Sequence, residues 1–157
     1  MIYVSLGTQD KKFPRLLQEV DKLIDKGIIK DEVIAQIGQT KYESKNMKLF
    51  DFIPKEDVLK YMNESRFIIT HGGVGTILDA LKLNKKVIAV ARLKLYKEHV
   101  NDHQLQIIRE YTKLGYILDG TYDLEKAIFD VNEFIPNKYV SNNDNFIKQL
   151  EDYIDNN

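Results

Sequence analysis

Short apolar runs of strand length alternate with helical patterns along most of this chain, which limits the folds that it can adopt. The apolar runs lie at residues 2–6, 33–37, 47–53, 66–70, 86–91 and 116–118. Helical patterns begin after Pro14 and Pro54, and further ones cover residues 76–83, 102–113 and 124–131. Strands that alternate with helices pair in parallel through right-handed crossovers. The sequence therefore predicts an α/β fold built on an open, doubly wound parallel sheet.

The length of the chain fits one domain. Its 157 residues can bury a single core, and they contain no internal repeat and no linker-like stretch. We therefore expect residues 1–157 to form one domain. Residues 139–157 are polar and rich in asparagine, and they end in a pattern typical of an amphipathic helix. The apolar positions of that pattern are Phe146, Ile147, Leu150 and Ile154.

Charge and cysteine content exclude several classes of function. The 23 Lys and Arg residues are balanced by 24 Asp and Glu residues, so no overall excess of charge favours nucleic acid or acidic lipid. The chain has no cysteine, which excludes disulfides and thiolate metal ligands and suits a reducing cytoplasm. The N-terminus lacks the features of a signal peptide, and no stretch approaches the roughly 20 apolar residues that span a bilayer. We expect a cytoplasmic protein that binds no nucleic acid and reaches a membrane only through another molecule.

The sharpest motif is THGGVGT, at residues 70–76, which follows an apolar strand and precedes a helix. Glycines permit a tight turn and a close approach of the backbone to a ligand. The start of the next helix offers unpaired N–H groups and the positive end of a dipole, which favour phosphate. A glycine-rich turn without a ligand explains the motif equally well. The motif is neither a Walker A loop, because no Gly-Lys-Ser/Thr follows, nor the dinucleotide fingerprint of a first strand–helix turn.

All three histidines of the chain fall near predicted strand ends. His71 lies in the glycine loop, and His99 and His103 lie in the segment EHVNDHQ. A lone histidine is more often structural than functional, but this grouping favours a site at one edge of the sheet. The spacing gives a zinc site little support, so we expect no metal.

Other residues follow strands at the same predicted edge. Asp79 lies three residues after Thr76 on the helix that begins at the glycine loop, where its carboxylate returns to the ligand side. Gly7 follows the first strand, and Arg92 ends the strand at 86–91. Asp102 stands at a predicted helix start, where a capping role is an equally good interpretation.

Taken in order, the segments SLGTQ, DFIP, THGGVGTILDAL, KKVIAVAR and EHVNDHQ resemble the C-terminal, donor-binding half of the family 28 glycosyltransferases. The resemblance covers residues 1 to about 110 and is more specific than any single motif. The pattern is similar to that of short, stand-alone members. These include the catalytic subunit of the two-part N-acetylglucosaminyl transferase of dolichol-linked glycan synthesis and bacterial counterparts in capsule and exopolysaccharide assembly. The resemblance implies a Rossmann-like GT-B half-domain that binds a UDP-sugar.

The resemblance also implies how the donor would be bound. Loop residues would hold the diphosphate through one side chain, backbone amides and the helix dipole, and they are His71, Gly72, Gly73, Gly75 and Thr76. Asp79 would bind the ribose hydroxyls, although family members often carry Glu at this position. Phe52 and Ile53 would face the uracil, and Gly7 and Thr8 would lie near the diphosphate or the acceptor cleft.

The EHVNDHQ segment would form the pocket for the transferred sugar. His103 and Gln104 would hold the sugar hydroxyls, and Glu98, His99 and Asp102 would shape the pocket. The residues with an expected catalytic role are His71, Glu98, His99 and His103. Arg92 is expected among the substrate-binding residues, as a cation near the phosphates.

Transfer from such a donor passes through an oxocarbenium-like transition state in which negative charge grows on the diphosphate. Fixed N–H donors and the helix dipole stabilise that charge, so we expect a hexosyltransferase that needs no metal and no cofactor. The base that deprotonates the acceptor must lie on the opposite wall of the cleft, which belongs to the N-terminal domain in full-length relatives. This chain lacks that domain. We therefore expect a membrane-anchored partner subunit that supplies the acceptor site and presents a lipid-linked saccharide.

One alternative function remains open, and two others are disfavoured by the sequence. The chain could be a non-catalytic UDP-sugar-binding subunit that enhances a partner enzyme. A UDP-sugar 2-epimerase normally needs both GT-B halves, which the length of this chain disfavours. A Rossmann-like oxidoreductase would carry the dinucleotide fingerprint in its first strand–helix turn, which is absent here.

Overall fold

The computed structural model describes residues 1–8 and 11–140, and it confirms the predicted α/β class. Its six strands are β1 (Ile2–Ser5), β2 (Val33–Gln36), β3 (Met47–Phe50), β4 (Phe67–His71), β5 (Val87–Val90) and β6 (Leu118–Asp119). They form one parallel sheet with the order β3-β2-β1-β4-β5-β6. This is the doubly wound, Rossmann-like order, in which the chain winds outward in both directions from the centre. The point where the direction reverses lies between β1 and β4.

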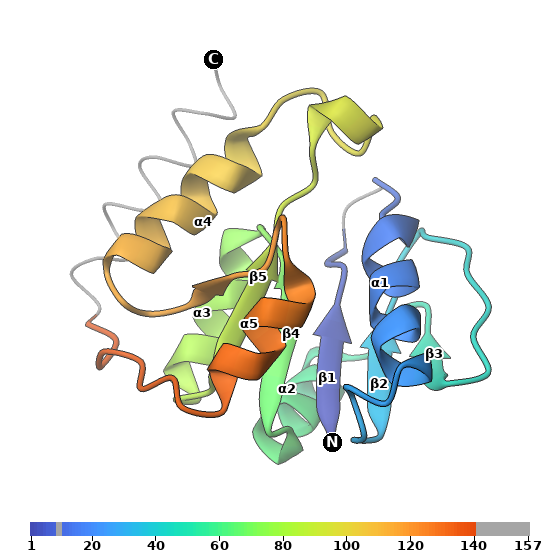
Figure 1. Ribbon diagram of the computed structural model, residues 1–157, viewed down its shortest axis with the longest axis horizontal. Coiled ribbons are helices and arrows are strands. Elements are labelled where there is room, and N and C mark those ends of the chain that lie inside the picture. The colour runs from blue at the N-terminus through green and yellow to red at the C-terminus, as the bar shows by residue number, and fades with distance from the viewer. Residues whose placement is uncertain (9–10, 141–157) are drawn as a thin grey trace.

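Helices cover both faces of the sheet (Figure 1). Helices α1 (Pro14–Asp25) and α5 (Leu124–Val131) pack on one face, and their apolar residues form one core cluster with strand side chains. Helices α2 (Lys55–Glu64), α3 (Val74–Lys82) and α4 (His103–Lys113) contribute to a second cluster on the other face. Because both faces are covered, β1, β2, β4 and β5 are buried along their whole length, which explains their continuous apolar runs.

The termini of several elements differ from the sequence prediction. The run at 116–118 forms a strand only at Leu118–Asp119, because the Tyr116 N–H donates to the Tyr111 carbonyl at the end of α4 (3.2 Å). The run at 47–53 pairs only as far as Phe50, and α3 begins at Val74, two residues before the predicted start. The amphipathic helix predicted on Phe146, Ile147, Leu150 and Ile154 lies outside the described residues.

No helix in the described ranges has the length and hydropathy that a bilayer-spanning segment requires.

Candidate functional site

The reversal of strand order brings two loops together at the carboxyl edge of the sheet. Ser5 pairs with Thr70 at the ends of β1 and β4, and the Thr70 hydroxyl donates to the Ser5 carbonyl (3.2 Å). Gly7 therefore lies beside the glycine loop, in a left-handed conformation (φ +77°) that favours glycine. Crevices at such reversals are the usual ligand sites of open α/β sheets.

The glycines of the loop have different structural roles. A Cβ atom at Gly73 would lie 2.2 Å from His71 Cε1, and one at Gly7 would lie 2.4 Å from His71 Nε2. A Cβ atom at Gly72 would lie 2.6 Å from the Gln104 Cβ. These three positions need glycine because side chains of the protein pack against them. A Cβ atom at Gly75 would meet nothing within 4 Å, so Gly75 faces open space.

A cavity of about 350 Å³ opens at this edge between α2, α3 and the end of β1. It brings together six of the predicted binding residues: Gly7, Thr8, Ile53, Gly75, Thr76 and Asp79. The other residues that line it were not among the predicted ones: Ser5, Gln36, Lys55, Val58 and Met62. Ser5 and Gln36 end neighbouring strands at this edge, a signal that the sequence already contained.

The N-terminus of α3 opens into this cavity without a side-chain cap from any described residue. Its N-cap is Gly73, and the Ile77 N–H donates to the Gly73 carbonyl (3.2 Å). Amides that precede this bond have no partner within the helix, and they carry the positive end of its dipole. On the rim, Lys55 of α2 forms an ion pair with Asp79 of α3. The cavity thus offers amide donors, one lysine and one carboxylate.

His71 is held from behind by a buried arginine. The Arg92 guanidinium, which is 0% exposed, donates to His71 Nδ1 (2.9 Å) and to the carbonyls of Leu6 (2.8 Å) and Lys11 (3.1 Å). It also lies over the Phe13 ring, 5.2 Å from its centroid. Because Nδ1 accepts this bond, the proton of the neutral imidazole is assigned to Nε2. Arg92 is therefore behind the loop and does not line the cavity.

Burial keeps His71 neutral. It lowers the pKa of the imidazole from 6.5 to about 3, and the charges of Arg92 and His99 act in the same direction. A neutral ring with a fixed Nε2–H can donate a hydrogen bond across the range of physiological pH.

Acidification is expected to lower the free energy of unfolding by about 2 kcal/mol between pH 7.5 and 5 through His71 alone. The pKa is 6.5 for the reference imidazole and about 3 in the folded protein, so the unfolded chain takes up this proton first. The stability is fully present above pH 6.5 and is lost as the pH falls toward 3. Urea unfolding at both pH values measures the loss, with His71→Asn as the matched variant, which retains an acceptor for Arg92. Equal losses in the two proteins would refute this assignment.

Two residues of the EHVNDHQ segment contact helix α1 or the loop that precedes it. Glu98 accepts hydrogen bonds from Arg15 Nε (2.8 Å) and Nη2 (3.0 Å) and from the Leu93 N–H (3.0 Å). His99 Nε2 lies 2.9 Å from Lys11 Nζ. Neither side chain lines the cavity at the α3 N-terminus.

The remaining residues of this segment also lie outside the cavity. Asp102 accepts the Lys94 N–H (2.8 Å), and it does not cap α4 with its side chain. Gln104 is buried, and its Oε1 accepts the N–H groups of Gly72 (3.2 Å) and Arg92 (3.0 Å). His103 is partly exposed at the start of α4. Sugar contacts by this segment stay a prediction.

Phe52 and Ile53 line different cavities. Ile53 lines the cavity at α3, whereas Phe52 lies beside Gly38 and lines a neighbouring cavity of about 420 Å³. Phe52 is 49% exposed, so its ring is accessible from solvent. Contact with a base stays a prediction for both residues.

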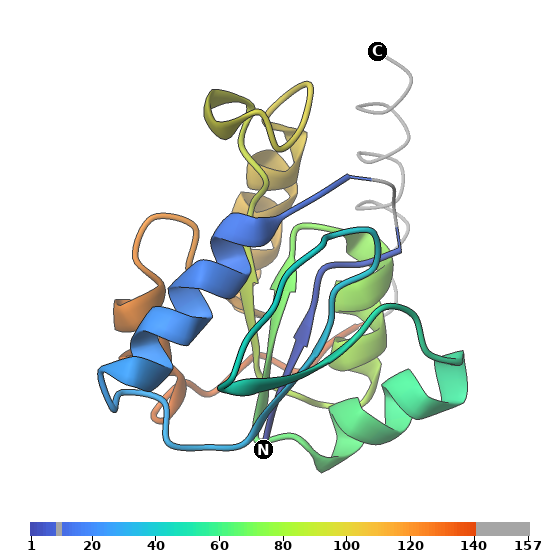
Figure 2. The same cartoon turned by 90° about the vertical axis from the view of Figure 1, so that its right-hand side faces the viewer.

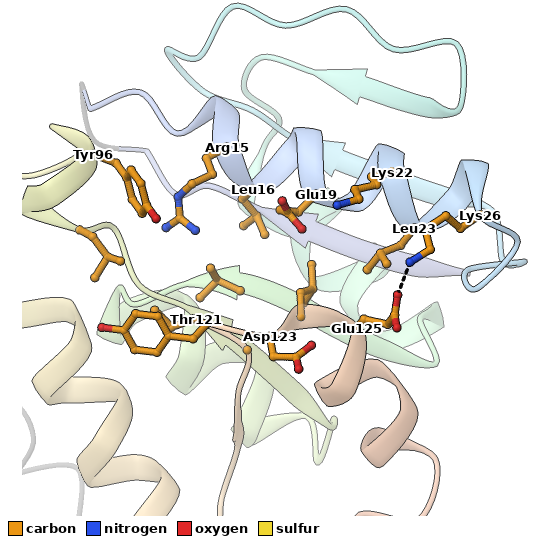
Figure 3. A pocket seen from close by; sticks show the side chains of 15 residues that line it. Arg15, Leu16, Glu19, Lys22, Leu23, Lys26, Tyr96, Thr121, Asp123 and Glu125 are labelled. Carbon is orange, nitrogen blue, oxygen red and sulfur yellow. Dashed lines mark hydrogen bonds and ion pairs between the residues drawn. The ribbon is translucent and has the colours of Figure 1, made fainter.

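A groove of about 380 Å³ lies on the opposite face of the sheet, between α1 and the segment that leads into α5 (Figure 3). It contains none of the predicted site residues. Its charged side chains balance: the cations are Arg15, Lys22 and Lys26, and the anions are Glu19, Asp123 and Glu125. Lys26 and Glu125 form an ion pair across it (2.7 Å). Helix α5 begins in this groove, but the side chain of its N-cap Asp123 already accepts the Lys126 N–H (3.0 Å) and places a carboxylate there. The cavity at α3 therefore fits a phosphate better.

Metal ligands do not cluster in the described part of the chain, where no three His, Asp or Glu side chains are placed to share an ion.

Comparison with known proteins points to one family. The model of the glycosyltransferase family 28 C-terminal domain matches residues 1–156. The UDP-N-acetylglucosamine transferase subunit ALG13 of Candida albicans is 31% identical over 104 residues, which are 66% of this chain and 30% of that protein. The protein of the same name from Candida glabrata is 31% identical over 108 residues, 68% of this chain and 50% of that protein. The chain thus spans half or less of these two relatives.

Solved structures share the fold. An NMR structure of ALG13 aligns with a TM-score of 0.57 and 24% identity, over 95% of this chain and 94% of that chain. The glycotransferase of kitacinnamycin aligns with a TM-score of 0.58 and 17% identity, over 83% of this chain and 34% of that chain. The longer of these two proteins contains the fold as one part of its chain.

Proposed function

Because the chain belongs to the family of the glycosyltransferase family 28 C-terminal domain, we propose that it binds a UDP-sugar in the cavity at the N-terminus of α3. We propose further that it is the donor-binding, catalytic subunit of a two-component transferase. One observation carries the proposal: an uncapped helix start opens into a cavity where Gly75 leaves room for a ligand. The names of the relatives make UDP-N-acetylglucosamine the first donor to test.

In this proposal the diphosphate lies against the first amides of α3. The helix dipole and the ammonium of Lys55 favour the negative charge that grows as the sugar leaves. His71 lies behind the cavity, against Gly7 and Gly73, and we propose that its Nε2–H adds a further donor. The amides and His71 belong to fixed elements, so they need little reorganisation during the reaction. Neutral His71 adds a donor without adding a charge that would repel the buried Arg92.

The nucleoside would extend from the diphosphate toward α2. Asp79 lies one helical turn after Thr76 and lines the cavity with its carboxylate on the rim, where it can accept hydrogen bonds from ribose hydroxyls. The apolar side chains of Ile53, Val58 and Met62 line the same cavity and suit a planar base. When UDP binds, Lys55 would exchange its ion pair with Asp79 for a phosphate.

The acceptor is proposed to come from a second protein. Relatives bear the name of a transferase subunit, and this chain spans half or less of the two compared. We propose a membrane-anchored partner that supplies the base and holds a lipid-linked saccharide, within capsule or exopolysaccharide synthesis. The resemblance of the EHVNDHQ segment to bacterial members supports that setting.

Asp79→Ala is expected to weaken UDP binding by about 1–3 kcal/mol, because the ribose loses a charged acceptor. Isothermal titration of the purified chain with UDP measures this change. Glu56→Ala is the matched control: Glu56 is an exposed acid next to Lys55 that does not line the cavity. Unchanged affinity in Asp79→Ala would show that Asp79 does not bind the ribose. Absence of UDP binding by the wild-type chain would refute the proposed function.

The same variant separates a catalytic subunit from a non-catalytic one. Transfer to a lipid-linked acceptor is measured with the partner present, using the wild-type chain and Asp79→Ala. A donor-binding catalytic subunit loses transfer in proportion to its loss of UDP affinity. Transfer that is insensitive to Asp79→Ala would instead identify the chain as an enhancer of an enzyme that binds its own donor.

A further inference from the structure

A loop at the carboxyl edge of the sheet exposes apolar side chains. After β5 the chain rises beyond the strand ends, turns through the 3-10 helix η1 (Lys94–Tyr96) and returns to α4 (Figures 1 and 2). Leu95 is 81% exposed, Val100 75% and Tyr96 54%. We refer to the exposed side chains Lys94, Leu95, Tyr96, Lys97 and Val100 as the 94–100 tip.

The backbone of the tip is tied to the domain. Glu98 anchors it through its bonds to Arg15 and to the Leu93 N–H. The Arg15 guanidinium lies over the Tyr96 ring, 4.7 Å from its centroid. Lys97 adopts a left-handed conformation (φ 57°), which closes the turn. The exposed side chains are therefore carried by a folded loop, and Tyr96 in addition lines the groove beside α1.

The tip is locally cationic although the whole chain carries a formal net charge of −1. Lys94 and Lys97 are exposed on either side of Leu95 and Tyr96, and Lys12 is exposed on the neighbouring β1–α1 loop. Of the nearby acids, Glu98 is buried in its ion pair with Arg15, whereas Asp102 is exposed and accepts the Lys94 N–H at the base of the loop. One exposed carboxylate thus opposes the exposed ammonium groups of Lys94, Lys97 and Lys12.

This combination favours a lipid surface over a protein surface. Lysine is depleted in the cores of protein interfaces, whereas lysines at a bilayer surface reach anionic headgroups while their aliphatic stems stay apolar. Tyrosine is enriched at the level of the headgroups, and exposed leucine and valine can enter the acyl boundary. We infer that the 94–100 tip contacts an anionic lipid bilayer.

The location of the tip indicates what the lipid contact would do for the donor cavity. It follows β5 at the same edge of the sheet as Gly7 and the glycine loop, so a bilayer at the tip would face the edge at which the donor cavity opens. One loop with a few apolar side chains binds lipid weakly and reversibly. Together with an anchored partner it would orient the cavity toward a lipid-linked acceptor. Only this orienting role rests on the proposed function.

Vesicle binding tests the inference with the full chain. Co-sedimentation is measured with phosphatidylcholine vesicles that contain or lack phosphatidylglycerol. The test variants are Lys94→Glu with Lys97→Glu, and Leu95→Ser with Val100→Ser. The matched control combines Lys60→Glu on α2 with Ile135→Ser after α5, an exposed lysine and an exposed apolar residue away from the tip. Thermal melting and UDP titration verify that each variant is folded.

The wild-type chain and the control are expected to bind anionic vesicles. Each test variant should bind them about tenfold more weakly or worse, since it loses either two headgroup contacts or two inserted side chains. Wild-type binding that does not depend on phosphatidylglycerol, or equal binding by the test variants, would overturn the inference. Loss of partner binding in the test variants without any vesicle binding by the wild type would also overturn it and identify a protein interface. UDP affinity is measured separately, so these failures leave the proposed function untouched.

Discussion

Replacing Arg92 with methionine is expected to lower the free energy of unfolding by about 3 kcal/mol. The substitution keeps an apolar stem of similar length but removes the guanidinium. Three acceptors then lose a donor: the buried carbonyl of Leu6, the partly buried carbonyl of Lys11 and the buried Nδ1 of His71, which keeps only Gln104 Nε2 at 3.4 Å. Each buried polar group without a partner costs about 1–3 kcal/mol.

The desolvation of Arg92 contributes to the free energy of unfolding in the opposite direction. Burial lowers the pKa of Arg92 to about 10, although the carboxylate of Glu98 favours the charged form, which means that the folded protein bears a desolvation cost for this cation. Methionine removes that cost. The expected net effect therefore lies below the sum of three unpaired acceptors.

Urea unfolding at neutral pH measures the change. Arg109→Met is the matched control, because Arg109 is exposed on α4, and it should change stability by less than about 0.5 kcal/mol. A loss below about 1 kcal/mol in Arg92→Met would contradict the expected net stabilisation by the three guanidinium hydrogen bonds. A spectroscopic probe of His71 adds a specific readout, because the ring loses the donor that fixes its tautomer.

The fold could be predicted because its signal is local. Strands buried on both faces must be continuous apolar runs, and the runs at 2–6, 33–37 and 86–91 fall on β1, β2 and β5. Strand order was not predicted, since it depends on which helix crosses which face. The β6 boundary was missed for a related reason. Tyr116 and Ile117 are as buried as strand residues, but the N–H of Tyr116 belongs to the end of α4.

Agreement between the sequence and the candidate cavity is limited to residues at or just after strand ends and on the helix that follows the glycine loop. The glycine loop, Gly7 and Asp79 meet around one cavity or directly behind it. The EHVNDHQ segment illustrates the limit of such reasoning. Glu98 pairs with Arg15, which is 83 positions away in the sequence, and no spacing rule identifies that partner. Lys55 carried no signal either, because a lysine at a helix start is ordinary until the fold places it beside Asp79.

The geometry of the glycine loop yields the second large expected effect. Gly75→Leu should lower the affinity for UDP by at least about 100-fold, or about 3 kcal/mol. Gly75 lies in the first turn of α3, and it does not have a positive φ, so a side chain is compatible with its backbone. A Cβ atom there meets nothing within 4 Å, and Gly75 lines the cavity. A leucine side chain would therefore occupy the space that the diphosphate is proposed to fill.

Gly75→Ala provides the matched control at the same position. Alanine is a better helix former than glycine by about 1 kcal/mol, so this variant should be at least as stable as the wild type. Its single methyl group fills little of the cavity, and most of the UDP affinity should remain. Titration with UDP and thermal melting of both variants separate a blocked site from a damaged fold. A stable Gly75→Leu protein that binds UDP as well as the wild type would place the donor elsewhere, because no diphosphate can share that volume with a leucine side chain.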